Sequence, residues 1–271
     1  MDSNSQQAKD SETLALIEEY LAGPGRFGID PKALSILDNV DSSRSEIASV
    51  EHLIDPVIAM RLRKLAGAVF RGMARHGTPT TFNDVIATLG MMPARTLIIA
   101  IALFSRLGPE HRRLETVSTA VSIFAKIIAE QMGFDRAAAE EAALGGLLLD
   151  LGRVVIAMYQ SATKVELGPD FERRHHRRIA SSVIAQFNLP DFILEIVQED
   201  RFVLQRRAFS IQGVVFLASA LVEKITDASG LIELKSPLPA VAGNLEVTLG
   251  SVFFDYFVQI GLGRFVRIIP C

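Results

Sequence analysis

The sequence predicts an all-α protein, and two observations support this fold class. Start and stop signals of helices recur along the 271 residues, whereas the alternation of apolar and polar residues that is typical of strands is scarce. The chain is 49% hydrophobic but only 7% aromatic and has no Trp, so its core must be built largely from Ala, Leu, Ile and Val. This composition favours packed helices.

Capping residues predict about five short helices in the first part of the chain. Asp30 and Asp55 each precede a Pro, which is typical of an N-cap followed by the first helical position. Ser45 is expected to cap the short helix between them. Gly90 and Gly108 are expected to end the next two helices.

A stretch rich in Gly, Pro and charge, GPEHRRLET, begins at Gly108 and is the best candidate for a boundary. The sequence therefore predicts an N-terminal lobe of short helices over residues 12–108 and a second helical lobe over residues 109–271. The polar start, MDSNSQQAKDSE, has no apolar core of an export signal and is expected to be a disordered leader.

Longer apolar segments follow the boundary. Val154 and Val155 belong to one long predicted helix with an apolar stripe. The predicted helices of this part are 117–133, 135–159, 171–188, 190–202, 209–227 and 247–261, and residues 236–244 are predicted to form a loop.

Charge and cysteine content exclude several classes of protein. A net charge of −3 gives no general attraction to nucleic acid. The single cysteine, Cys271, allows neither a disulfide framework nor a cysteine metal site, which suits a reducing cytoplasm. The longest apolar runs, such as LIIAIALF at residues 97–104, fall short of the roughly 20 residues of a membrane span. We therefore expect a cytoplasmic protein with no membrane partner.

The stretch GGLLLDLGRVVI places Asp150 among apolar residues of a predicted helix. A carboxylate in such a position is unfavourable to bury unless it is paired or binds an ion. Asp150 is therefore either a structural carboxylate, satisfied by His176, Arg153 or a helix-end amide, or the remnant of a metal site.

Five segments of the chain, in order, resemble the HDOD family, the HD-related output domains of bacterial signalling proteins. The resemblance implies a two-lobed, HD-domain-like helical fold with a core over about residues 25–225, and no established hydrolase chemistry. It also implies an output or scaffold role in two-component or cyclic-dinucleotide networks. Since the chain is little longer than this module, we expect a stand-alone version. The matching segments are IDPVIAMRLRKLAGAVF, GTPTTFNDVIATLGMMPARTLIIAIAL, VSTAVSIFAKIIAEQ, EEAALGGLLLDLGRVVI and HHRRIASSVIAQFNLPDFILEIVQED.

The chain departs from the family pattern at the positions that matter for metal binding. The pattern LLHDIGK usually has His where this chain has Leu149, and leucine cannot ligate a metal. Asp150 and His176 are the matching polar residues that remain, and we name them the vestigial HD site. The other departures are Arg153 for Lys, Ala180 for Gly, Phe187 for Trp, and QEDR at residues 198–201 for a pair of His. The sequence thus predicts no catalytic residue, no metal and no cofactor.

The one dense basic cluster, FERRHHRR, supplies a candidate surface for an anion or an acidic partner. The alternative is a solvated first turn of a helix. His175 and His176 point about 100° apart on a helix, so one is expected to pack inward and the other to be solvated. The arginines of the candidate surface are Arg173, Arg174, Arg177 and Arg178.

These observations predict a non-catalytic signal-transduction module that acts by binding a signalling protein not identifiable from the sequence. One alternative is a metal-dependent phosphohydrolase with atypical ligands, which requires Asp150, His176 and either Glu199 or Asp200 to converge. The other is a sensor that binds an anionic nucleotide through the arginine cluster. Self-association stays open, because burial is not readable from the sequence.

Overall fold

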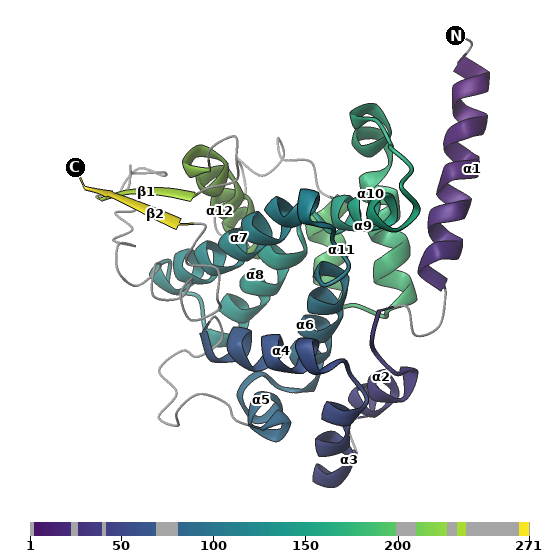
Figure 1. Cartoon of the computed structure of the whole chain (residues 1–271). Helices are drawn as coiled ribbons and strands as arrows, with labels where there is room; N and C mark the ends of the chain where they lie inside the picture. Colours follow the sequence, from purple (N-terminus) through teal and green to yellow (C-terminus); the bar gives the residue numbers. More distant parts are fainter. Residues whose placement is uncertain are drawn as a thin grey trace.

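The computed structural model confirms the all-α, two-lobed architecture and describes residues 3–22, 27–39, 42–68, 81–198, 210–226, 232–236 and 266–270. One group of helices lies on one side of α6 (Met91–Phe104), and a larger group lies on the other (Figure 1). The smaller group consists of α2 (Pro31–Asp38), α3 (Arg44–Ser49), α4 (Pro56–Ala68) and α5 (Phe82–Leu89). The larger group consists of α7 (Arg112–Gln131), α8 (Arg136–Leu148), α9 (Leu151–Thr163), α10 (Pro169–Gln186), α11 (Asp191–Gln198) and α12 (Ile211–Ile225). Short 3₁₀ turns span Val50–His52 and Pro109–His111.

The helix ends of the smaller lobe follow local capping chemistry. The carboxylate of Asp30 accepts a hydrogen bond from the backbone of Lys32, and that of Asp55 accepts one from Val57, both at 2.8 Å. These two caps are confirmed. The predicted cap Ser45 is wrong, because Ser43 forms a capping box with Glu46 one turn later in α3.

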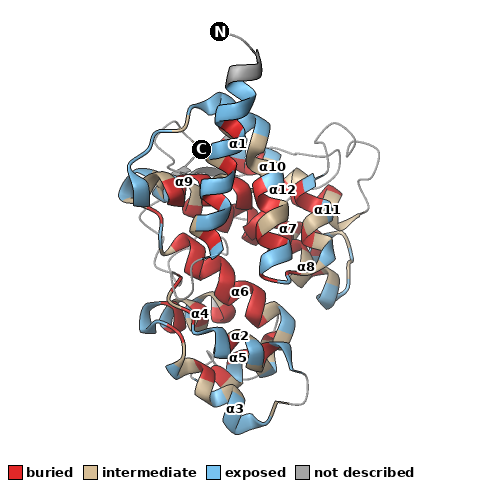
Figure 2. Ribbon diagram, turned by 90° about the vertical axis from the view of Figure 1, so that its right-hand side faces the viewer, coloured by how far each residue is buried: buried red, intermediate tan, exposed pale blue. Residues whose placement is uncertain are grey.

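Helix α6 joins the two lobes. Every residue from Ala94 to Phe104 is buried, and the helix packs on α2, α4 and α5 as well as on α8 and α9 (Figure 2). Gly90 ends α5 with a φ of 84°, as predicted, whereas α6 ends at Phe104 before reaching Gly108. A helix that is buried on all sides has no polar face, so periodicity alone cannot locate its end.

The predicted helix 135–159 is two helices. It begins as expected after Asp135, which caps the backbone of Ala138, but α8 ends at Leu148 and α9 begins at Leu151. Asp150 therefore lies at the N-cap position of α9, with φ −97° and ψ 24°, and not in the middle of a helix. Because the apolar pattern continues across this break, the sequence pattern did not predict where α8 ends and α9 begins.

The start of the chain is helical, which corrects the expectation of a disordered leader. Helix α1 (Ser3–Ala22) buries Asp10, Leu14, Ile17 and Leu21. It packs on α9 and α10 of the larger lobe, so residues 12–22 lie beside that lobe and not in the smaller one to which the sequence assigned them. Burial of this stripe stabilises a helix that is polar elsewhere.

Two short strands were not predicted. β1 (Ile232–Ser236) and β2 (Val266–Pro270) pair in parallel, with Ile232 opposite Val266. They form a small sheet near α12 (Figure 1). The predicted helix 247–261 and the predicted loop from residue 237 onward lie outside the described residues.

Within the described residues, α8 and α9 taken together (Arg136–Thr163) are apolar and long enough to cross a membrane by length and composition alone. However, 83% of its most apolar window is buried inside the protein. The pair α5 and α6 passes the same test only together and is bent by 117°. Both segments thus serve as core helices of the two lobes.

Candidate functional site

The vestigial HD site lies where α8 ends, α9 begins and α10 passes alongside. Asp150 occupies the junction, and Arg153 follows one turn later on α9. The Nη1 atom of Arg153 lies 3.2 Å from Oδ1 of Asp150, and its Nε atom lies 3.1 Å from Oε1 of Glu172 on α10. One guanidinium therefore bridges two carboxylates from two elements.

His176 lies on α10 next to the start of α9. Its Nδ1–H donates to the backbone carbonyl of Glu172 at 2.9 Å, one helical turn earlier. Of the partners proposed for Asp150, the structure brings Arg153 to it, while His176 bonds within its own helix. A Cβ at Gly152 would overlap the carbonyl oxygen of His176, so this glycine sets the close approach of α9 and α10.

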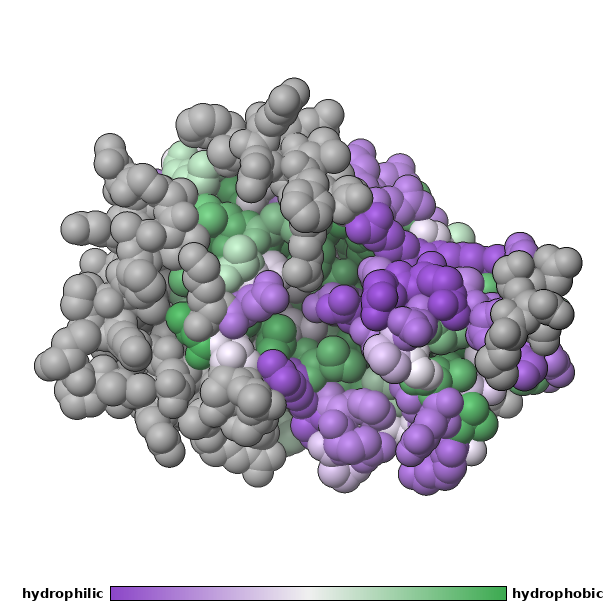
Figure 3. All heavy atoms as spheres, turned by 90° about the horizontal axis from the view of Figure 1, so that it is seen from above, coloured by the Kyte–Doolittle hydropathy of each residue, from purple (hydrophilic) through white to green (hydrophobic). Residues whose placement is uncertain are grey.

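A pocket of about 330 Å³ opens beside this site. It lies between the first turns of α7, the α8–α9 junction and the last turns of α12. Seen from above, hydrophobic residues lie in hollows between hydrophilic ones (Figure 3). The lining residues are Arg113, Leu114, Val117, Asp150, Arg153, Ser219, Glu223 and Thr226. The pocket therefore combines charged groups of both signs with hydroxyls and an apolar wall.

The residues of this site do not fit a divalent metal of the HD type. Leu149 is half-buried against the core and offers no donor atom. Asp150 and Glu172 are both ion-paired with Arg153. In the part of the chain that the structure describes, no three His, Cys, Asp or Glu side chains converge as a metal site. Glu199 and Asp200, which the phosphohydrolase alternative requires, lie outside that part.

The candidate basic surface on α10 is largely engaged by carboxylates. Arg173 pairs with Asp170 of its own helix at 3.0 Å. Arg177 is half-buried on the same helix. Arg174 and Arg178 instead face α1, at 2.9 Å from Asp10 and 3.9 Å from Glu18.

Asp10 is the functional candidate that the sequence analysis missed. Its Oδ2 atom lies 2.7 Å from Nε2 of His175, and the side chain is buried. The hydrogen bond from His175 lowers the pKa of the Asp10 carboxyl, with further hydrogen bonds from Gln6 and Arg174 acting in the same direction against the effect of burial.

A signal for Asp10 was present in the sequence. Its spacing of four, seven and eleven residues from Leu14, Ile17 and Leu21 places it on their helical face. The polar composition of the first twelve residues instead led to the prediction of a disordered leader.

The two histidines differ from expectation as well. Both are half-buried, whereas one was expected to be solvated. The ring of His175 packs against that of Phe171 in a tilted arrangement, with ring centroids 4.7 Å apart, while its Nε2 reaches Asp10. His175 thus links α10 to α1, and His176 belongs to the vestigial site.

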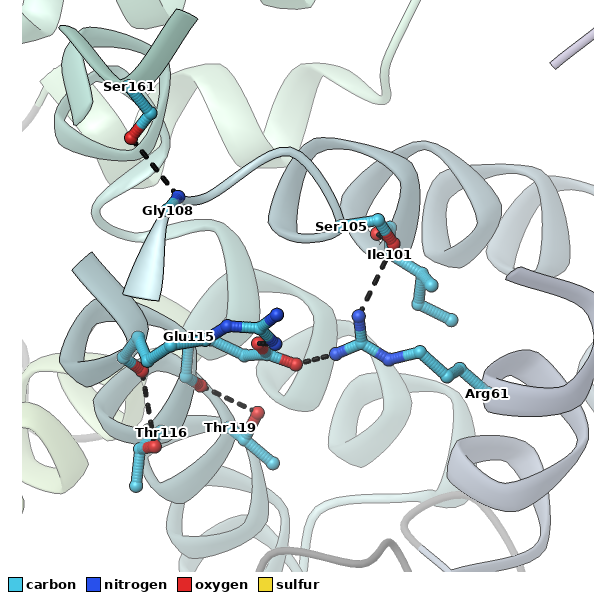
Figure 4. A network of polar contacts seen from close by, with 9 residues as sticks. Arg61, Ile101, Ser105, Gly108, Glu115, Thr116, Thr119 and Ser161 are labelled. Atoms are coloured by element: carbon cyan, nitrogen blue, oxygen red, sulfur yellow. Dashed lines mark hydrogen bonds and ion pairs between the residues drawn. The ribbon is translucent and has the colours of Figure 1, made fainter. Parts of the chain in front are cut away.

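A polar network joins the two lobes (Figure 4). Glu115 of α7 is buried and ion-paired with Arg61 of α4, and Arg112 approaches it at 3.4 Å. Arg61 also donates to the hydroxyl of Ser105. Burial lowers the pKa of the Arg61 guanidinium. A buried carboxylate between two arginines fixes how α4 meets α7.

A buried arginine connects the lobes on another side. The Nε atom of Arg95 in α6 lies 2.7 Å from Oδ1 of Asp38 in α2. Its Nη1 donates to the carbonyl of Asn188, which follows α10. Neither network was predicted, because its members lie far apart in the sequence.

Comparison with known proteins identifies the family to which the chain belongs. The profile of the HDOD domain matches residues 29–201. No curated protein matches the chain. A solved "HDOD domain protein with unknown function" from Geobacter sulfurreducens is 21% identical, with 94% of this chain and 89% of that chain covered and a TM-score of 0.46. A solved "Putative phosphohydrolase" from Shewanella amazonensis SB2B is 19% identical, with 92% and 88% covered and a TM-score of 0.51. Because the profile match spans more than half of the residues of this chain, the chain belongs to the HDOD domain family.

Proposed function

We propose that this protein is a non-catalytic regulatory module of bacterial signal transduction that acts by binding a protein partner. The observation that carries the proposal is the arginine bridge at the vestigial HD site. Arg153 lies between Asp150 and Glu172 and supplies one positive charge to both carboxylates.

An arginine bridge cannot replace a metal in hydrolysis. A catalytic metal lowers the pKa of a bound water and polarises the phosphoryl oxygen, and it needs open coordination positions. A guanidinium stays protonated, offers only N–H donors and coordinates nothing. With Leu149 where the family pattern has His, the remaining side chains support binding and not water activation.

A phosphoesterase assay tests this proposal. The full chain is incubated with p-nitrophenyl phosphate and bis(p-nitrophenyl) phosphate, each with added Mn²⁺ or Mg²⁺. We expect the rate to equal that of the Asp150→Asn variant and of buffer containing the same metal. Metal-dependent turnover that is lost in Asp150→Asn would overturn the proposal and favour the phosphohydrolase.

The pocket supports a second candidate, a sensor for a small anionic ligand. Two arginines and two hydroxyl side chains line it, and these groups bind phosphate well. In this candidate function the anion would contact Arg113 and Arg153 of the pocket, where it would compete with Asp150 and Glu172 for Arg153. The arginines of α10, which the sequence analysis named for this role, likewise face carboxylates. A melting-temperature screen with nucleotides tests it. A rise that Arg113→Ala removes would support a sensor, and no rise with any nucleotide would reject it.

The remaining expectations belong to the same proposal. A module that meets its partner in trans within a signalling network would work in the cytoplasm, and it needs neither a cofactor nor a membrane. Whether it also self-associates is measurable by light scattering on the full chain.

A further inference from the structure

The face of α9 and α10 that α1 covers is built like a receptor for a helix. Helix α1 lies outside the residues that the family profile matches, yet it packs along α10 and α9. It runs beside α10 at the edge of the molecule, with its first turns extending beyond the body (Figure 1). Residues 6–9 of these turns are exposed.

The apolar part of the contact is one narrow stripe. Leu14, Ile17 and Leu21 are at most 3% exposed, although neighbouring residues of α1 face solvent. Tyr20 adds an edge-to-face contact with Tyr159 of α9, with ring centroids 5.6 Å apart. Spacings of three and four residues are those by which an amphipathic helix binds in a groove.

Along the same stripe, acidic side chains of α1 face basic side chains of α10. Asp10 faces Arg174 and His175 near the start of the stripe, and Glu18, eight residues later, faces Arg178. All three basic groups belong to α10, and both acidic groups belong to α1. The part of the candidate basic surface formed by Arg174 and Arg178 is therefore already occupied by an acidic helix of the same chain.

We propose that this face of α9 and α10 is a docking surface for an acidic amphipathic helix of a protein partner, and that α1 is its intramolecular occupant. The partner helix would carry a carboxylate, apolar residues four, seven and eleven positions later, and a second carboxylate at position eight. The inference rests on the proposed function and names its surface and kind of partner. Because α1 is tethered, it competes at an effective concentration in the millimolar range, so a free helix binds only when α1 is released.

Displacement of α1 is testable on the full chain with a fluorescent peptide of residues 3–22 as the probe. Fluorescence anisotropy measures its affinity for the wild type and for Asp10→Asn, which loses charge-assisted hydrogen bonds that hold α1 in place. We expect the variant chain to bind the wild-type peptide about 10- to 100-fold more tightly than the wild-type chain does. Glu19→Gln, which changes an exposed carboxylate of the same helix, should leave the affinity at the wild-type value.

A second pair of variants tests the receptor side. Arg174→Ala in the Asp10→Asn chain should weaken peptide binding, whereas Arg173→Ala, which pairs within α10, should not. If Asp10→Asn lowers the helix content of the whole chain, Glu18→Gln at the edge of the contact replaces it.

The outcomes are separable from those of the proposed function. Equal or absent peptide binding in well-folded wild type and variant would overturn the docking surface. A wild-type dimer that dissociates in Asp10→Asn would overturn it too, because α1 would then occupy a second copy. Neither result bears on phosphoester turnover, which alone decides the question of catalysis.

Discussion

At the scale of single residues, Arg153 is the side chain on which the vestigial site depends. It is about one-third exposed, and it holds Asp150, which is 17% exposed, and Glu172 of α10. Removing it leaves two neighbouring carboxylates without their shared cation. The resulting loss combines a missing ion pair with repulsion between like charges.

We predict that Arg153→Ala lowers the free energy of unfolding by about 1–2 kcal/mol. Urea denaturation measures it. The matched control is Arg173→Ala, whose pair with Asp170 is exposed on both sides, so its effect should stay within about 0.5 kcal/mol. Equal effects of the two substitutions would contradict the role given to Arg153.

Asp10 is predicted to make stability depend on pH in the acid range. Its pKa in the folded protein lies below the ordinary value of 3.8, chiefly because His175 donates a hydrogen bond to it. The carboxylate therefore stabilises the fold above that value, and this contribution is lost as the pH falls through the lowered folded pKa.

The comparison of wild type with Asp10→Asn measures this contribution. Near neutral pH the variant should be less stable by about 1.5–3 kcal/mol, since hydrogen bonds to a charged group are lost. The difference should shrink as the pH falls below about 4. A difference that grows on acidification would contradict the assignment, and Glu12→Gln on the exposed side of α1 is the control.

Single residues were predictable from the sequence where their partners lie nearby in it. Arg153 stood among the predicted partners of Asp150 because one helical turn separates them. Its second contact, with Glu172, depends on how α10 lies against α9, and no local pattern encodes that packing. The same holds for Asp10 and His175, which are 165 positions apart.

At the scale of elements, the junction of α8 and α9 determines the shape of the site. Gly152 lies in the first turn of α9 directly against the backbone of His176, where a Cβ has no room. The approach of the two helices at this point brings Arg153 within reach of Glu172. The glycine of the family pattern thus keeps a structural role in this chain.

We predict that Gly152→Ala destabilises the protein by about 1–3 kcal/mol, because the backbone must move to accept the methyl group. Gly168→Ala is the control, since a Cβ there meets no atom within 4 Å. Its effect should be at most about 1 kcal/mol, arising from its N-cap position. Thermal unfolding followed by circular dichroism compares them, and a larger loss at Gly168 would contradict the packing argument.

The ends of helices were predictable from the sequence where a capping residue acts locally. They were not predictable where apolar residues continue past the end of the helix. Asp30, Asp55 and Gly90 act within one helical turn, so their roles follow from the sequence. The break at Asp150 follows from tertiary packing, because apolar residues continue on both sides of it. Helix α1 was missed because its stability comes from a stripe of buried side chains on α9 and α10.

At the scale of the whole molecule, two ion-pair networks bridge the lobes, and each has one buried member, Glu115 in the first and Arg95 in the second. The order of the family's segments predicted the fold, whereas these networks could not be predicted from the sequence. Arg61 and Glu115 meet across the interface between α4 and α7. A buried carboxylate that loses its partner is strongly destabilising.

A double-mutant cycle with Arg61→Met and Glu115→Gln tests this connection. We expect Arg61→Met, which leaves the buried Glu115 carboxylate without its main partner, to lower the free energy of unfolding by about 3 kcal/mol. The coupling energy of the pair should exceed about 1 kcal/mol. Additive effects of the two substitutions in urea denaturation would show that the pair does not join the lobes.

The central claim is that Arg153 occupies, between Asp150 and Glu172, the place of a metal. The measurement that tests it most directly is elemental analysis of the chain purified without a His-tag, beside the Asp150→Ala variant. We expect that neither protein carries stoichiometric Mn, Fe, Zn, Ni, Mg or Ca. Stoichiometric metal in a well-folded wild type that disappears in Asp150→Ala would contradict it and make the site a metal centre.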